Sequence, residues 1–124
     1  MGFRSHREFG AWQLAYELRR ALMPLLRKLL QAHDYSLHKN MREAARTPPR
    51  NIAEGFGRFK HRDFARFVRI AKASEVEMLD HLLEAHTSGY VDANELAALE
   101  HLTKKAIKAA NGLIRYLENT PDKD

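Results

Sequence analysis

The sequence predicts an all-α protein, a single domain over residues 1–124 that folds as an up-and-down antiparallel four-helix bundle. Apolar residues recur every three or four positions through four long stretches, which is the pattern of helices with one buried face. The connections between the stretches are short, and the chain contains only six glycines and four prolines. The expected helices cover approximately residues 7–32, 36–57, 61–86 and 93–118.

The first expected helix carries a leucine-rich apolar face that begins with Phe9 and Trp12. Trp12 falls on this face, which favours a core position over a base-stacking position. Pro24 lies inside the helix, lacks a backbone donor and crowds the preceding turn, so we expect a kink near residues 20–23.

The second expected helix contains the strongest backbone signals of the chain. Ser36 is its expected N-cap. Pro48 and Pro49 remove two consecutive backbone donors, so we expect the helix to kink or stop near Thr47, with a bend over residues 47–50. Pro49 can open a new helical turn, and this helix is then expected to end at Gly55 and Gly57.

The third expected helix has an apolar stripe on one side and a basic stripe of Arg62, Arg66 and Arg69 on the other. Three arginines on consecutive turns can follow a phosphate backbone without reading bases. A solvated face in which an arginine pairs with Asp63 is the alternative use of the same pattern.

Two carboxylates fall in apolar surroundings. Glu54 is expected to be a structural partner that accepts from backbone donors or from an arginine, rather than a general acid or base. Glu75 lies on the apolar stripe of its helix beside Ala71 and Met78, so it is expected to pair with a basic residue of another helix or subunit.

The fourth expected helix has a clear beginning. Asp92 and Glu95 have the spacing of a capping box. Residues 119–124 form a polar tail that is expected to fray.

The net charge of +5 is unevenly distributed along the chain. Residues 39–72 carry ten basic and three acidic side chains, a net charge of +7, whereas residues 73–100 carry seven acidic side chains and no Lys or Arg. The basic block suits a polyanion such as RNA or DNA, because its phosphates release counterions on binding. The two blocks together also suit pairing between subunits or with a protein partner. The candidate nucleic-acid contacts are Arg42, Arg46, Arg50, Arg58, Lys60, Arg62, Arg66 and Arg69.

The sequence gives little support to an enzymatic function. Its seven histidines lack the spacing of metal ligands, and it has no cysteine, no Gly-x-Ser-x-Gly elbow and no phosphate loop. We therefore expect no catalytic residues, no metal and no cofactor. The first ten residues have no apolar signal core and no apolar run is long enough to span a bilayer, so we expect a cytoplasmic location and no membrane partner.

Residues 51–58, Asn-Ile-Ala-Glu-Gly-Phe-Gly-Arg, resemble the signature of the four-helix-bundle family of 23S ribosomal RNA intervening-sequence proteins. Apolar and polar matches extend along most of the chain. The sequence departs from the family pattern at Thr47-Pro48-Pro49, usually Ser-Ile-Pro, at Glu43, usually Arg, and at Ala73, usually Gly. The signature and structural positions that the resemblance identifies are Asn51, Glu54, Gly55, Gly57, Ser74 and Glu77.

This resemblance implies a homopentamer shaped like a short barrel. It also implies a distant relation to accessory proteins of diversity-generating retroelements, which bind nucleic acid and a reverse transcriptase. We therefore expect a non-catalytic, oligomeric nucleic-acid-binding protein with little sequence specificity. A protein-interaction adaptor or scaffold, whose segregated charges mediate subunit or partner contacts, is the alternative, and a structural role in the ribosome is a weaker third reading.

Overall fold

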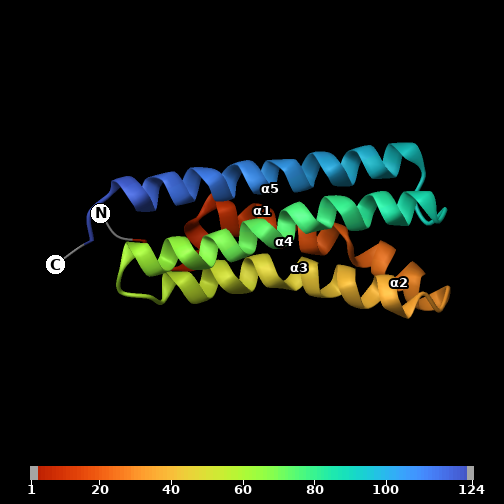
Figure 1. The fold of residues 1–124 in the computed structure, drawn as a ribbon, viewed down its shortest axis with the longest axis horizontal. Helices are drawn as coiled ribbons and strands as arrows, with labels where there is room; N and C mark the ends of the chain where they lie inside the picture. The colour runs from red at the N-terminus through yellow and green to blue at the C-terminus, as the bar shows by residue number, and fades with distance from the viewer. Residues whose placement is uncertain (1–2, 123–124) are drawn as a thin grey trace.

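The computed structural model describes residues 3–122, and the regular elements among them are helices (Figure 1). In chain order they are η1 (His6–Glu8), α1 (Gly10–Ala21), α2 (Met23–Gln31), α3 (Tyr35–Phe56), α4 (His61–Thr87) and α5 (Ala93–Asn119). α1 and α2 form one rod that is broken at Leu22, so this part of the chain builds a four-helix bundle. Short connections make each rod run opposite to the next, as the sequence predicts.

The rods are arranged around a core that has two apolar clusters. α1 and α4 lie on opposite corners, because each of them packs against both α3 and α5. One cluster lies where α2 meets α3 and the far half of α4, and it includes Leu29, Met41 and Leu82. The other lies between α1, α3, α4 and α5 at the opposite end, and it includes Ile52 and Val68.

The break in the first rod confirms the kink predicted near residues 20–23. α1 ends at Ala21, and Pro24 is the second residue of α2. In the first turn of a helix a backbone N–H has no partner within the helix, so the donor that proline lacks costs no helical hydrogen bond there. The rod begins later than expected, at Gly10, because residues 6–8 form the separate turn η1 and Phe9 has an extended backbone.

The two consecutive prolines do not end α3. The helix runs unbroken through Pro48 and Pro49, both of which are buried, so of the kink or stop expected near Thr47 the stop does not occur. Side chains reinforce the backbone on either side: the Thr47 hydroxyl donates to the Glu43 carbonyl (2.8 Å), and the Asn51 amide donates to the Thr47 carbonyl (2.9 Å). Packing against α1 and α4 outweighs the loss of two backbone hydrogen bonds. A change of axis direction at residues 47–50 stays a prediction.

The start of α3 also differs from the expectation. The N-cap is Asp34 rather than Ser36, because the Asp34 carboxylate accepts a hydrogen bond from the Leu37 backbone N–H at 3.3 Å. The other Asp34 oxygen accepts from the Tyr90 hydroxyl at 3.0 Å. One carboxylate therefore joins the beginning of α3 to the connection between α4 and α5.

Gly55 does not release the chain from the helix, in contrast to the expectation. It lies inside α3, where an added Cβ would come within 2.7 Å of Phe64 Cδ1 and 2.9 Å of Phe67 Cβ. The absence of a side chain lets α3 and α4 approach closely at this level. Gly57 is the C-cap of α3, with a right-handed backbone conformation.

The helix α5 begins as the sequence predicts. The Asp92 carboxylate accepts from the Glu95 backbone N–H and the Glu95 carboxylate accepts from the Asp92 backbone N–H, both at 2.8 Å. This reciprocal pair is a complete capping box. Within residues 3–122, none of the helices combines the length and the apolar character needed to cross a membrane.

Candidate nucleic-acid interface

Basic side chains concentrate at the end of the bundle where α3 connects to α4. An open hollow of about 730 Å³ is lined there by Lys60, Arg62, Arg66 and Arg69, together with Asp63 and Asp122. We call this surface the basic hollow. All four cationic side chains are exposed. The three arginines meet there because residues three and four apart on a helix share a side, as the sequence predicts.

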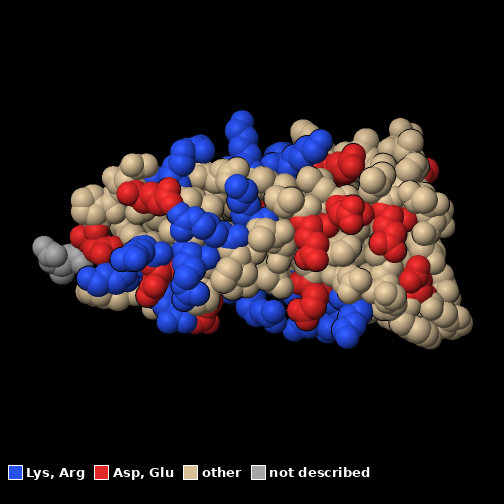
Figure 2. Space-filling view, in the orientation of Figure 1, with Lys and Arg blue, Asp and Glu red and all other residues tan. Residues whose placement is uncertain are grey.

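The surface charge differs between the two ends of the bundle. Figure 2 shows most of the Lys and Arg side chains of this face over the half where α4 begins, with a few Asp and Glu among them, and a group of Asp and Glu side chains over the opposite half, with further Lys and Arg along its lower edge. Along α4 the charges are segregated, because its Lys and Arg residues all lie in its first half and its acidic residues other than Asp63 follow them.

Ion pairs and aromatic contacts hold part of the basic hollow in place. The Arg69 guanidinium pairs with the Glu118 carboxylate of α5, whereas the alternative pairing of an arginine with Asp63 is absent from the described part of the chain. The guanidinium carbons of Arg58 and Arg66 lie 4.7 and 4.6 Å from the ring centroid of Phe67. These cation–π contacts hold two exposed arginines against the same ring.

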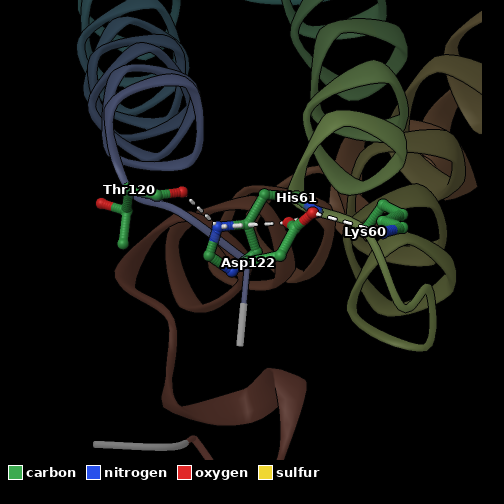
Figure 3. Close-up of polar contacts among 4 residues, drawn as sticks. All are labelled: Lys60, His61, Thr120 and Asp122. Carbon is green, nitrogen blue, oxygen red and sulfur yellow. Dashed lines mark hydrogen bonds and ion pairs between the residues drawn. The ribbon is translucent and has the colours of Figure 1, made fainter. Parts of the chain in front are cut away.

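Asp122 reaches into the same end of the bundle from the segment after α5 (Figure 3). Its carboxylate accepts a hydrogen bond from the His61 backbone N–H at 2.7 Å and lies 3.9 Å from Lys60 Nζ. His61 Nδ1 lies 2.8 Å from the Thr120 carbonyl oxygen, to which it donates when that nitrogen carries the proton. Asp122 thus adds a negative charge at the N-terminus of α4, where Asp63 already lies in the first turn and the N-cap residue Lys60 makes no side-chain cap.

These contacts correct the expectation for the polar tail. α5 extends to Asn119, and residues 120–122 are held against α4 rather than frayed. Residues 123 and 124 lie outside the described residues.

The eight candidate contacts do not form one surface. Arg46 and Arg50 line a groove of about 300 Å³ between α1 and α3, together with Trp12. Arg50 also lies 3.6 Å from the Glu43 carboxylate in an exposed pair. Arg42 is exposed earlier on α3. The structure therefore brings together half of the predicted residues in the basic hollow, and it places Arg58 next to them.

The signature positions make mostly structural contacts. Glu54 pairs with Arg58 one turn later at 3.1 Å, which confirms the prediction of an arginine partner, although the pair is exposed. Glu77 is exposed and lies 3.7 Å from His81 Nε2. Ser74 is half-buried. The contacts of the other three positions, Asn51, Gly55 and Gly57, lie within α3, at its end or against α4.

Glu75 departs from its expected pairing. Its side chain is fully buried, and neither carboxylate oxygen has a hydrogen-bond partner within residues 3–122. Burial raises its pKa from 4.5 to about 8, because the charged form loses its hydration. The carboxyl group is therefore mostly neutral near pH 7, and the expected ion pair is not formed within the described chain.

The predicted site residues leave out three residues at the basic end that the contacts and exposure of their side chains mark as candidates. They are Phe59, Tyr116 and Asp122. Phe59 does have a local signal, because it stands between Arg58 and Lys60 in the connection after α3. The other two come from the far end of the sequence, and no local pattern indicates that they return to α4.

One family model matches the chain. It is described as 23S rRNA-intervening sequence protein, and it covers residues 7–112. The matched range includes the four cationic residues of the basic hollow and ends before Tyr116 and Asp122. No curated protein sequence matches the chain.

Proposed function

The chain belongs to the 23S rRNA-intervening sequence protein family, and from this premise we propose that it is a non-catalytic, oligomeric protein that binds RNA or DNA. The observation that carries the proposal is the basic hollow, where Lys60, Arg62, Arg66 and Arg69 converge on one exposed surface. Such a surface attracts a phosphate backbone and releases its counterions.

The geometry favours binding with little sequence specificity. The arginines occupy successive turns of one helix, so they can follow a line of phosphates, and phosphate contacts carry no base information. Arginine suits this role because its planar guanidinium donates two parallel hydrogen bonds to a phosphate. Two of the three arginines are partly preorganised, because Arg66 contacts the Phe67 ring and Arg69 pairs with Glu118.

Oligomerisation would multiply these contacts. We propose that the chain acts in the cytoplasm and forms a homopentamer, the assembly that the family resemblance implies. Five basic hollows on one assembly would bind a long polyanion more tightly than a single basic hollow would, because binding at one hollow raises the local concentration of phosphate at the neighbouring hollow.

A charge-reversal experiment tests the proposal. The first variant replaces the three arginines of the basic hollow: Arg62→Glu, Arg66→Glu and Arg69→Glu. The control variant reverses three exposed lysines of α5, with the same change in net charge: Lys104→Glu, Lys105→Glu and Lys108→Glu. Circular dichroism and light scattering establish whether each variant keeps the helical content and the mass of the wild type.

Nuclease-treated protein is then titrated with RNA and with DNA at fixed salt concentration. We expect the arginine variant to lose at least about tenfold in affinity, and the lysine control to lose much less. An arginine variant that binds as tightly as the wild type would refute the proposal. Equal losses in both variants would show that net charge, rather than the basic hollow, governs binding.

A protein-interaction adaptor or scaffold is the second candidate, and the acidic half of the face in Figure 2 favours it. The basic end of one subunit could meet the acidic end of another, or of a partner such as the reverse transcriptase that the family resemblance suggests. Light scattering separates the two functions. The adaptor predicts that the arginine variant loses its oligomeric mass, whereas nucleic-acid binding predicts an intact oligomer with weakened affinity.

A further inference from the structure

A pocket with aromatic walls opens at the same end of the bundle as the basic hollow. Its volume is about 420 Å³, within the range of about 300 to 1,000 Å³ that is usual for small-molecule sites. We call it the aromatic pocket. Six of the residues that line it carry the argument: Phe9, Phe56, Arg58, Phe59, Phe64 and Tyr116.

The inner wall of the aromatic pocket is fixed by contacts between its own rings. Phe9 lies edge-to-face with Phe56 and with Phe64, at centroid distances of 5.6 and 5.5 Å. Phe9 and Phe64 are buried and Phe56 is half-buried. These three rings belong to the bundle core, so the wall is preorganised rather than adaptable.

The outer wall is different, because its rings are exposed. Phe59 has an exposed fraction of 76%, the largest among the big apolar side chains of residues 3–122, and Tyr116 has 43%. Phe59 lies in the connection between α3 and α4, outside the core. An aromatic ring left this exposed beside a preformed pocket contributes little to the fold and is suited to cover a flat ligand.

Two cationic side chains lie at the aromatic pocket. Arg58 lines it, and Lys60 Nζ lies 5.5 Å from the Phe59 ring centroid. A shallow depression of about 460 Å³ shares His61 with the aromatic pocket and shares Arg62 and Arg69 with the basic hollow. An apolar site for a flat group therefore borders directly on a surface that suits phosphates.

We propose that the aromatic pocket takes an unpaired nucleobase of a single-stranded nucleic acid whose phosphates lie on the basic hollow. This inference rests on the proposed function and narrows it to single strands. Charge complementarity selects this occupant, because an apolar ligand or peptide has no use for a cationic rim, whereas a nucleotide combines a π face with a phosphate. A duplex keeps its bases stacked internally, so it can reach the basic hollow but cannot fill the pocket.

The test compares nucleic acids that differ only in accessible bases. The probes are a single-stranded RNA oligonucleotide, a duplex of the same length and an abasic strand with the same number of phosphates. The protein variants are Phe59→Ala and, as a matched control, Tyr35→Ala, which removes an exposed ring (60% exposed) at the opposite end of the bundle. Phe59→Trp restores a stacking ring and adds a fluorophore at the pocket.

We expect Phe59→Ala to weaken binding of the single strand by about 5- to 100-fold, the usual range for loss of one base–aromatic stack. Binding of the duplex and of the abasic strand should not change. Tyr35→Ala should bind all three probes like the wild type. Phe59→Trp should keep the affinity for the single strand, and the base should quench its added fluorescence.

The outcomes separate this inference from the proposed function. If Phe59→Ala binds the single strand like the wild type while the Arg62, Arg66 and Arg69 variant loses affinity, the inference is overturned and phosphate binding stands. If the wild type binds none of the probes, both are overturned. If Phe59→Ala lowers the oligomeric mass without selectively weakening the single strand, Phe59 is a subunit contact and the inference is also overturned.

Discussion

Replacing Glu75 by glutamine should remove a pH dependence from the stability of the protein. The folded chain holds this carboxyl fully buried and without a hydrogen-bond partner in the described region, so it keeps the neutral form to a higher pH than the unfolded chain does. Glutamine has nearly the same shape and stays neutral at every pH. The variant therefore isolates the free energy of burying a carboxylate.

The magnitude follows from the two pKa values. The pKa of Glu75 is 4.5 when the side chain is hydrated and about 8 in the fold. Between these values the unfolded chain has released a proton that the folded chain retains, so stability falls by about 1.4 kcal/mol per pH unit. Below pH 4.5 the carboxyl is neutral in both states and its contribution is complete. Over the whole window the loss approaches about 5 kcal/mol, a large part of the roughly 5–15 kcal/mol that stabilises a domain.

The assay is urea unfolding followed by circular dichroism, at pH values from about 5 to about 9 and at one protein concentration. The free energies of unfolding of wild type and Glu75→Gln should differ little at the acidic end and diverge by several kcal/mol in favour of the variant at the alkaline end. Glu84→Gln, an exposed change on the same helix, should follow the wild type. A constant difference between wild type and Glu75→Gln over this range would refute the reasoning, because it would show that Glu75 is not neutral in the fold.

Further variants test packing, the basic hollow and helix capping. Gly55→Ala should lower the free energy of unfolding by about 1 to 3 kcal/mol, because the methyl group would overlap two aromatic side chains of α4. Gly112→Ala, where no atom crowds the new methyl group, should raise it by about 0.5 to 1 kcal/mol. Asp122→Asn should tighten nucleic-acid binding by about two- to fivefold by removing an anion from the basic hollow, whereas Glu84→Gln, with the same change in charge, should not. Asp92→Ala should lower the free energy of unfolding by about 1 kcal/mol through loss of the capping box.

Three of these variants have a result that would contradict the reason given for them. A Gly55→Ala protein as stable as the wild type would mean that α3 and α4 can move apart without loss. Unchanged affinity of Asp122→Asn would mean that its carboxylate does not compete with phosphate. Unchanged stability of Asp92→Ala would mean that water replaces the capping box at no measurable cost.

The bundle itself follows from local patterns in the sequence. Helical periodicity reports which face is buried, and it places α4 and α5 within a residue or so of their ends. Pro24 acts locally too, so the break at Leu22 could be predicted. Family resemblance and periodicity agree on these elements.

The errors arise where tertiary contacts override local preference. Pro48 and Pro49 are unfavourable in an isolated helix, but in α3 they are buried in packing against neighbouring rods. Gly55 resembles a helix stop until Phe64 is placed against it. Asp34 displaces Ser36 as the N-cap, and Asp34 also accepts a hydrogen bond from Tyr90, far along the chain.

Part of the candidate site could likewise be predicted from the sequence, and part could not. Helix geometry alone brings Arg62, Arg66 and Arg69 to one side of α4. Their companions, Glu118 and Asp122, come from the end of α5 and beyond it, so only the three-dimensional fold shows that they reach the basic hollow.

The salt dependence of RNA binding tests the central claim most directly. Four phosphate contacts by the basic hollow predict that the logarithm of the affinity for a single strand falls with the logarithm of salt concentration with a slope of about −3 per subunit. The slope should become much shallower in the variant with Arg62→Glu, Arg66→Glu and Arg69→Glu. An affinity that does not change with salt, or an identical slope in wild type and variant, would contradict the account.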